Sequence, residues 1–441
     1  MPVKPRYIYF SFLAVPIAAI GYLVERDQSW ALFALFAIAF AAYFILVIKR
    51  DSTLKELLVA GIMLRLMLIG VSPELSDDYY RFAFDGDMLI HGENPYLVFP
   101  DSLENPTEYQ AMLVEEMNSP KYYTVYPPIN QIFFSVPSLI AGDNIVVYTF
   151  VLRILIVLFE ILMALLLLKM LQFLKKDLKL FAWYFLNPLV VIELSGNLHF
   201  EGVTMFFMLL AFYMLMIGKF WRSAVVYAVA IGTKLIPLIL LPFFFKRLKM
   251  KAFVYYSVIG LMTVVLFLPF INTELIANMS SSIQLYFDDF MFNGSILYLV
   301  NDITMTFTGY EYNLEVLGNV FQGVVLIAVV LMSLFEKKPD WNSLIQKGLF
   351  ALLIYYSVAA IVHPWYVINL VALSLFTNYK FPYVWSALAL LSYSAYNGDG
   401  SVTEHPLILI IEYVLLFGMV IFEMIYYRKV KKVAETPAIQ S

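Results

Sequence analysis

The feature that most constrains this chain is the recurrence of apolar runs of about 20 residues along almost its whole length. A helix of that length crosses the hydrocarbon core of a bilayer, which is about 30 Å thick. Hydrophobic residues make up 62% of the chain and charged residues 14%, a balance that excludes a water-soluble fold. We therefore expect an all-α integral membrane protein with about twelve full spans, near residues 7–24, 30–48, 56–72, 145–171, 179–195, 199–217, 252–271, 313–335, 344–362, 365–377, 380–396 and 405–427.

A further apolar run, 222–245, has lysines and arginines at both ends and Gly232, Thr233, Lys234 and Pro237 in its middle. Because both ends carry the charge typical of the cytoplasmic side, we expect a hairpin of two short helices broken between Lys234 and Pro237. Such a break is tolerated at membrane depth where protein or a water-filled cavity meets the freed backbone groups. A similar argument makes 129–141 a short dip from the outer side.

The distribution of positive charge predicts the orientation. With the N-terminus inside, 23 of the 29 Lys and Arg residues fall on inner segments. Both termini are then cytoplasmic, and two long segments, 73–128 and 272–312, lie on the outer face. We expect one polytopic domain over residues 1–427, beginning with an uncleaved helix, and a short disordered cytoplasmic tail at 428–441. The lack of cysteine and of an ER-retrieval signal favours a bacterial inner (plasma) membrane.

Composition also removes several classes of function. Without cysteine there are no disulfides, Cys-ligated zinc sites, iron–sulfur clusters or thiolate nucleophiles. A formal net charge of −4 gives no basic field for a nucleic-acid backbone. The sequence has neither a Gly-rich phosphate loop nor a long cytoplasmic segment, so a nucleotide-binding domain is disfavoured.

The first outer loop holds the densest polar and aromatic sequence, which starts at Ser76. A helix beginning there places Asp78, Arg81 and Asp85 on one side, and we expect it to lie at the membrane interface. Crowding and partial desolvation raise the basicity of adjacent carboxylates, so Asp77 or Asp78 could act as a general base. The alternative is structural: Ser76 caps the helix, the aspartates complement its dipole, and Arg81 forms an ion pair with Asp78 or Asp85. Both alternatives remain open from this stretch alone.

The same loop ends at Tyr122–Pro128, where two prolines enforce an extended backbone before the dip at 129–141. Tyr126 in this stretch could line a sugar site or anchor the chain at the interface, and interfacial anchoring is the commoner role.

Several short motifs together resemble those of the polyprenyl-phosphate-mannose-dependent mannosyltransferases, which belong to the GT-C class of polytopic glycosyltransferases. The motifs follow in order from about residue 70 to 370: Ser76–Phe82, Phe84–Gly86, Gly92–Tyr96, Tyr126–Pro128, Asn187-Pro188, Asn197–Gly202, Lys234–Pro237 and His363–Tyr366. Each motif is weakly specific by itself, and their order makes the set fairly specific.

The resemblance implies a GT-C fold and transfer of a sugar from a lipid phosphate on the outer side, with inversion at the anomeric carbon. It also implies that a first-loop aspartate is the base, with Asp78 as first choice and Asp77 as second. Related sequences usually have a glycine before the histidine and an aspartate two positions after it, where this chain has Leu198 and Glu201. These departures leave the acceptor open.

The chemistry requires a carboxylate to take a proton and cations to stabilise the departing phosphate. We expect Arg81, Lys234 and His363 to bind the donor phosphate. The expected sugar or acceptor ligands are Asp85, Tyr126, His199, Glu201 and Tyr366. Structural alternatives are a helix cap for His199 and Glu201, snorkelling for Lys234 and an interfacial turn for 363–366. No spacing pattern fixes a metal site, so we expect no metal and no cofactor besides the lipid-linked donor, although a divalent ion is not excluded.

Two other interpretations compete with a glycosyltransferase. A transporter or flippase for a lipid-linked sugar would share the spans, the broken helices and the buried cations, and would be expected to show inverted repeats. A structural membrane subunit would use its buried charges as interface pairs, and for Arg153 and Glu160 we expect such a pair. The acidic first loop is poorly explained by a structural subunit, and the resemblance implies a membrane glycosyltransferase that moves mannose from a polyprenyl-phosphate donor to an acceptor glycan or glycolipid.

Overall fold

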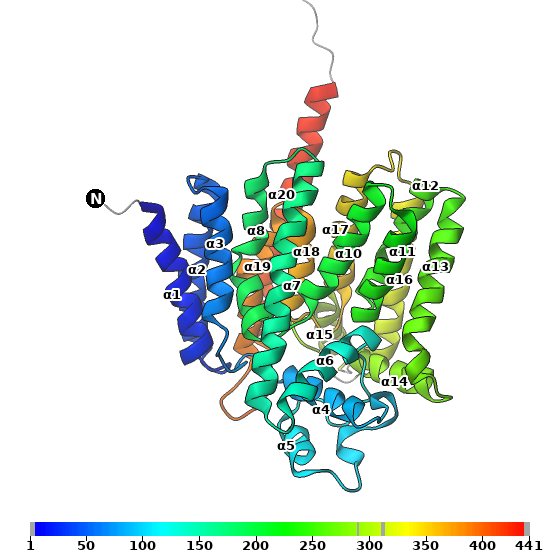
Figure 1. The fold of residues 1–441 in the computed structure, drawn as a ribbon. Coiled ribbons are helices and arrows are strands. Elements are labelled where there is room, and N and C mark those ends of the chain that lie inside the picture. Colours follow the sequence, from blue (N-terminus) through cyan, green and yellow to red (C-terminus); the bar gives the residue numbers. More distant parts are fainter. Residues whose placement is uncertain (1–4, 289–290, 310–313, 436–441) are drawn as a thin grey trace, which may run out of the picture.

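The computed structural model describes residues 5–288, 291–309 and 314–435 as a bundle of helices with a layer of shorter helices at one end (Figure 1). Within these residues the β contacts are two isolated bridges, Phe292 with Ile361 and Tyr396 with Val402. The first turn of α1 and the last turns of α20 lie at the opposite end of the bundle from α4, α5 and α14 (Figure 1). The all-α expectation is confirmed.

The α-helices are α1 (Pro5–Leu23), α2 (Ser29–Lys49), α3 (Leu54–Met67), α4 (Asp78–Ile90), α5 (Glu108–Glu116), α6 (Pro128–Ala141), α7 (Ile145–Phe173), α8 (Ala182–Phe185), α9 (Pro188–Val190), α10 (Glu201–Met216), α11 (Phe220–Thr233), α12 (Phe244–Leu248), α13 (Lys251–Phe267), α14 (Leu275–Asp288), α15 (Ile296–Thr308), α16 (Leu314–Leu334), α17 (Trp341–Val358), α18 (Val367–Ser374), α19 (Phe381–Leu388) and α20 (Pro406–Glu435). Tighter or wider helical segments are η1 (Pro95–Leu97), η2 (Pro100–Ser102), η3 (Leu178–Phe181), the π-helix η4 (Val191–Gly196), η5 (Ile236–Phe243), η6 (Leu268–Phe270), η7 (Pro364–Tyr366) and η8 (Ala389–Ala395).

Six helices of the described chain are by themselves long and apolar enough to cross a membrane, or up to seven when one bent pair counts as a single span. They cover Pro5–Leu23, Ser29–Lys49, Ile145–Phe173, Lys251–Phe270, Val316–Leu334 and Pro406–Val430. The other expected spans coincide with shorter or broken helical segments, which an apolar run does not reveal. Helix α20 continues to Glu435, so the first part of the expected disordered tail is helical, and residues 436–441 lie outside the described part.

Two breaks position functional residues. Leu178–Phe185 and Pro188–Gly196 form the bent pair, at an angle of 54°, and Asn187 accepts hydrogen bonds from the backbone after the proline. The expected break in 222–245 is also present: α11 ends at Thr233, Lys234 is extended, and η5 follows with Pro237 near its start. The hydroxyl of Tyr227 donates to the Pro237 carbonyl and so satisfies a group freed by the break.

The two long loops of the expected outer side contact each other. Asn278 of α14 donates to the Tyr96 carbonyl, and Asn94 donates to the Phe270 carbonyl. Helix α6, the predicted dip at 129–141, lies with α4 in this layer (Figure 1). Asp289 lies outside the described residues.

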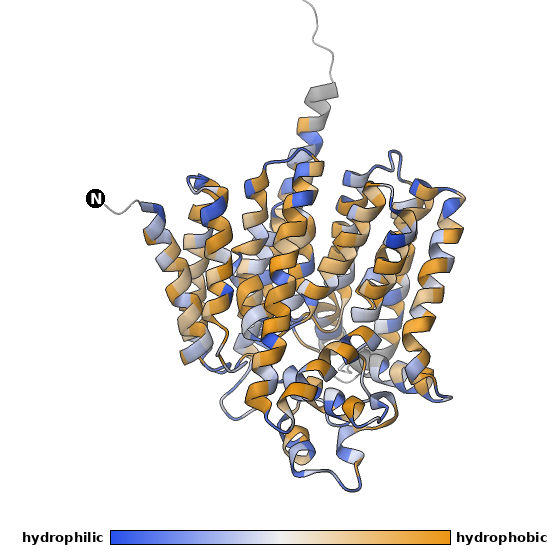
Figure 2. Ribbon diagram, in the orientation of Figure 1, coloured by the Kyte–Doolittle hydropathy of each residue, from blue (hydrophilic) through white to orange (hydrophobic). Residues whose placement is uncertain are grey.

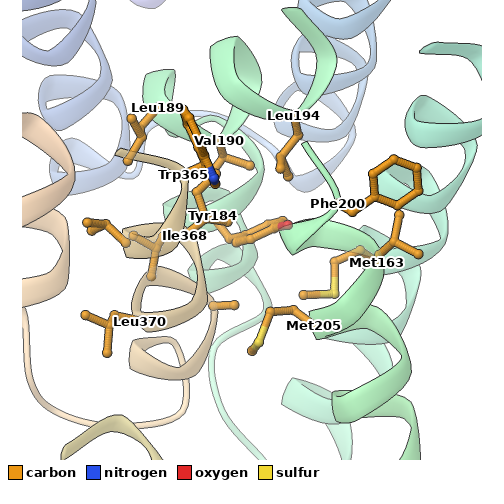
Figure 3. Close-up of a cluster of buried hydrophobic side chains, with 14 of the residues drawn as sticks. Met163, Tyr184, Leu189, Val190, Leu194, Phe200, Met205, Trp365, Ile368 and Leu370 are labelled. Atoms are coloured by element: carbon orange, nitrogen blue, oxygen red, sulfur yellow. The ribbon is translucent and has the colours of Figure 1, made fainter. Parts of the chain in front are cut away.

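The core is one large apolar cluster that runs through the bundle and reaches the α4 layer. Figure 3 shows part of it, with Tyr184 between Met163, Leu194 and Met205 on one side and Trp365 and Ile368 on the other. Hydrophobic residues cover the helices along their length, and hydrophilic residues are most frequent at helix ends and in the layer of α4 and α5 (Figure 2).

The predicted pair between Arg153 and Glu160 is wrong. Glu160 instead pairs with Arg65 of α3 at 2.8 Å and accepts a hydrogen bond from Tyr184. Arg153 donates to the backbone carbonyls of Ser195 and Gly196, at the end of the bent span, and of Ile69, just after α3. Carbonyls freed by an irregular turn can accept the hydrogen bonds of a buried cation, and the sequence gives no sign of them.

Candidate active site

Helix α4 brings the first-loop carboxylates to the bundle. It begins at Asp78, two residues after the expected start, and the Ser76 hydroxyl accepts a hydrogen bond from the Asp78 backbone. The helix packs so closely on α6 that a Cβ on Gly86 would lie 2.3 Å from the Phe134 carbonyl. Phe82 stacks on Phe134 with ring centroids 4.5 Å apart, and these contacts fix the position of the helix.

The two candidate bases have different surroundings. Asp77 is ion-paired with Arg26, 2.7 Å away, and this arginine also lies over the ring of Tyr396. Asp78 accepts one hydrogen bond, from the side chain of Asn118, and its other oxygen lies 3.8 Å from Nε2 of His199. Arg26 thus occupies the Asp77 carboxylate, whereas no lysine or arginine of the described residues forms an ion pair with Asp78. The surroundings therefore favour Asp78 over Asp77 as the candidate general base.

Arg81 forms the ion pair that the structural alternative predicted. Its Nε lies 2.8 Å from Asp85, and its Nη1 donates to the carbonyls of Ser119 and Tyr122. Asp85 is fully buried and also accepts from Gln131. Arg81 thus ties α4 to the end of the loop, and a role in binding phosphate remains a prediction.

Tyr126 belongs to the same support. Its ring packs edge-on against Phe82 and Phe134, and its carbonyl accepts a hydrogen bond from the hydroxyl of Tyr96. The structure thereby gives Tyr126 a packing role near the bundle surface, and sugar binding by this residue remains a prediction.

His199 is held from two sides. Its Nδ1 lies 3.2 Å from the carboxylate of Glu193 and 3.0 Å from the carbonyl of the same residue. Its Nε2 lies 3.2 Å from the hydroxyl of Ser76. The preceding residue, Leu198, has a φ of +66°, a left-handed conformation that favours glycine. The resemblance implies a glycine at this position, and a glycine would adopt this conformation without strain.

Trp365 lies between two imidazoles. Its ring stacks on His199 with centroids 3.6 Å apart, and on His363 with centroids 4.2 Å apart. The segment before η7 is fixed by the bridge between Phe292 and Ile361, and Phe292 also contacts the ring of His363. The C-terminal half of the chain thus completes a site that begins in the first loop.

His363 lies between α17 and η7, and the charged groups that act on it are other predicted site residues. Burial among aromatic rings lowers the pKa of His363 to about 3; the Asp78 carboxylate opposes this shift, whereas His199 and Lys234 add to it. The imidazole is therefore neutral at neutral pH. Its Nδ1 is buried without a hydrogen-bond partner among the described residues.

Lys234 at the helix break is ion-paired with Glu201, the first residue of α10. Its ammonium also lies 4.9 Å from the centre of the Tyr366 ring. Glu201 is buried and Lys234 is a quarter exposed. The second carboxylate oxygen of Glu201 is buried and unpaired within the described part of the chain.

The structure therefore gathers Asp78, His199, Glu201, Lys234, His363 and Tyr366 around Trp365, whereas Arg81, Asp85 and Tyr126 support α4 from behind. Sequence reasoning missed Glu193, Trp365 and Arg26. Glu193 had a usable signal, since a lone carboxylate inside an apolar run is by default a functional candidate. Within the described residues, no group of three or more His, Cys, Asp or Glu side chains is arranged to hold a metal ion.

Comparison with known proteins identifies a family for the N-terminal half of the chain. No curated protein matches the chain significantly. Residues 16–248, which include Asp78, His199, Glu201 and Lys234, match the family described as alpha-(1->6)-mannopyranosyltransferase, N-terminal domain. With more than half of its length matched and its predicted motifs gathered in one site, the chain belongs to this family of membrane mannosyltransferases.

Proposed function

We propose that the protein transfers mannose from a polyprenyl-phosphate donor to a hydroxyl of an acceptor glycan or glycolipid on the outer side of the membrane. The observation that carries this proposal is the convergence of Asp78, Lys234 and the stacked aromatic residues at the junction between the outer loops and the bundle. A reaction between a lipid-anchored donor and a polar acceptor needs a site at that junction. Family membership supports mannose as the sugar and a GT-C type of fold.

Asp78 is the proposed general base. As the acceptor oxygen attacks the anomeric carbon from the side opposite the phosphate, the carboxylate removes its proton, and the configuration inverts. Asp78 is one-fifth exposed, so that an acceptor hydroxyl can reach it. Asp77 is the weaker candidate because Arg26 neutralises it.

Lys234 is the proposed ligand of the donor phosphate. Its ammonium is partly exposed and forms an ion pair with Glu201. A donor phosphate would either displace the Glu201 carboxylate from the ammonium or bind the ammonium beside it. As the bond between the anomeric carbon and oxygen breaks, negative charge grows on the phosphate, and a fixed cation stabilises it. The unpartnered Nδ1 of His363 supplies a neutral polar contact in the same place.

The aromatic residues complete the site. Tyr366 lies beside Lys234, and Trp365 stands between the two histidines. Such rings suit the apolar face of a sugar or the first isoprene unit of the lipid. We assign Glu201 and His199 to the part of the site nearest the acceptor.

The proposed orientation places α4, α5 and α14 outside and both ends of the chain inside, as in the charge distribution. The first described turn of α1 and the end of α20 share one end of the bundle, in agreement with an even number of crossings (Figure 1). The proposed membrane is a bacterial plasma membrane, and the proposed reaction uses no nucleotide and no resident cofactor.

The test uses membranes that contain the wild-type protein, Asp78→Asn, Asp77→Asn or Lys234→Ala at matched expression. Each is supplied with polyprenyl-phosphate-[¹⁴C]mannose or with GDP-[¹⁴C]mannose, and transfer to endogenous acceptors is counted. We expect transfer from the lipid donor only, abolished by Asp78→Asn and retained in the matched control Asp77→Asn. Transfer from the nucleotide sugar in membranes without polyprenyl phosphate would overturn the donor assignment. Transport of a lipid-linked sugar across vesicle membranes without any transfer would favour the transporter.

A further inference from the structure

The fully buried carboxylate of Glu193 is a group that the mechanism above does not use. It lies in η4, a π-helical turn within the bent span, between Pro188 and the start of α10. π-Helical turns insert an extra residue and often mark functional sites. Burying an isolated carboxylate costs several kcal/mol, so its partners indicate what it is for.

The partners of Glu193 are specific. The hydroxyl of Tyr393, 200 residues further along the chain, donates to Oε1 at 3.0 Å. Oε2 lies 3.2 Å from Nδ1 of His199, and the Glu193 carbonyl lies 3.0 Å from the same nitrogen. The carbonyl is placed to accept a hydrogen bond from Nδ1, whereas Oε2, which has no hydrogen-bond partner among the described residues, adds a negative charge beside that nitrogen.

This arrangement fixes the position of the proton on the imidazole. The Glu193 carbonyl can only accept a hydrogen bond, so Nδ1, which faces it, carries the proton in the neutral ring. Nε2 then presents its lone pair toward Asp78, whose Oδ2 is 3.8 Å away, and toward the Ser76 hydroxyl at 3.2 Å. The stack on Trp365 prevents the ring from turning away.

We propose that His199 receives the proton that Asp78 removes from the acceptor, and that Glu193 positions His199 and stabilises the imidazolium that forms. This inference rests on the proposed function and extends it from a single base to a relay. A buried negative charge beside Nδ1 stabilises the imidazolium that the second transfer forms.

The step balances in protons and electrons. The O–H bond of the acceptor breaks, its oxygen bonds to the anomeric carbon, and the phosphate leaves with the electron pair of the old glycosidic bond. The proton passes to Oδ2 of Asp78 and then to Nε2 of His199. Asp78 is thereby an ionised base again, and the imidazolium returns its proton to water when the products leave.

The principal test substitutes Glu193→Gln, which keeps an oxygen acceptor near Nδ1 and removes the negative charge. We expect kcat for transfer from polyprenyl-phosphate-mannose to fall at least tenfold, with the donor KM within about twofold of wild type. The titratable groups that face His199 are Glu193, Asp78 and, across Trp365, His363. Because the Glu193 charge acts on the imidazolium that forms during the reaction, its loss should appear in kcat and not in the donor KM.

A matched control is Glu412→Gln. Glu412 is another fully buried carboxylate, which accepts from Trp385 and Asn293 and lies outside the His199 cluster. Its variant should keep kcat within about twofold of wild type. A Glu193→Gln enzyme with unchanged kcat, while Asp78→Asn is inactive, would overturn the relay and leave the proposed function standing.

A second measurement does not depend on enzymatic activity and is made on the wild-type protein. The chain has four histidines, so ¹⁵N-histidine labelling of the wild-type protein in detergent gives few signals, and His199→Gln assigns one of them. At pH 8 we expect His199 to be protonated at Nδ1 and unprotonated at Nε2. A proton on Nε2 would overturn the relay, whether or not any sugar donor is accepted.

Discussion

The indole of Trp365 lies flat on the imidazole of His199, with ring centroids 3.6 Å apart and an angle of 17° between the rings. The two residues come from opposite halves of the chain. His199 lies near Asp78, the proposed base, and Trp365 precedes Tyr366, whose ring lies beside Lys234. The contact therefore joins the proposed base to the proposed phosphate ligand.

Trp365→Leu should therefore lower the rate of mannose transfer strongly while the protein still folds. The variant removes both ring stacks, worth about 0.5–1.5 kcal/mol each, and releases the imidazole of His199. We expect kcat to fall tenfold or more, measured with saturating polyprenyl-phosphate-mannose. Trp365→Phe, which keeps an aromatic ring, should recover part of that loss; equal activity of the two variants would contradict a positioning role for the ring.

Lys234 and Glu201 can be separated by a double-variant cycle. Lys234→Met leaves the Glu201 carboxylate buried without its cation, which typically costs about 3–5 kcal/mol in unfolding free energy. Glu201→Gln combined with Lys234→Met should restore most of that stability, measured by unfolding in detergent. It should not restore transfer, because the phosphate still lacks its cation; restored transfer would assign the lysine a structural role only.

Because His363 is neutral in the folded protein, we predict a particular pH dependence of folding stability. Its pKa of about 3 in the folded protein lies below the ordinary value of 6.5, so the unfolded chain takes up the proton first as the pH falls. Stability is therefore lost as the pH is lowered from about 6.5 toward 3. Between pH 6.5 and 4.5, before most carboxylates titrate, the melting temperature of wild type should fall more steeply than that of His363→Gln. Parallel curves would show that His363 is not buried as described.

The left-handed backbone conformation of Leu198 lets us predict how a substitution to glycine changes the free energy of unfolding. Leu198→Gly relieves about 1–2 kcal/mol of conformational strain but removes a fully buried leucine side chain, which costs about 2–5 kcal/mol. We expect a net loss of roughly 1–3 kcal/mol. The control Leu186→Gly, equally buried but at a φ of −105°, has no strain to relieve and should lose at least 1 kcal/mol more.

The sequence predicted those features that depend on local composition. Apolar runs gave the helical membrane fold, Ser76 and its aspartates gave α4 to within two residues, and Pro237 marked the break beside Lys234. These features follow from helix length, capping and the missing proline amide, which act over a few residues.

The features that sequence reasoning missed depend on contacts between distant residues. Arg26 meets Asp77 and Tyr393 meets Glu193 only because the bundle closes. The lengths of individual spans were missed because an apolar run continues through a π-helical turn or a bend, as at residues 178–196, without a change in hydropathy. Arg153 was assigned to Glu160 because the two lie on one helix, whereas its partners are carbonyls of another.

The hydrogen bond from Tyr393 to Glu193 spans 200 residues and has a consequence for how the protein is made. When the ribosome has completed the part that matches the family, up to residue 248, Asp78, His199 and Lys234 already exist, but Trp365, His363 and Tyr393 do not. The nascent chain thus holds an unfinished site, which closes only after the last third has entered the membrane. The complete set of site residues is therefore present only late in synthesis, once Tyr393 has been made and can reach Glu193.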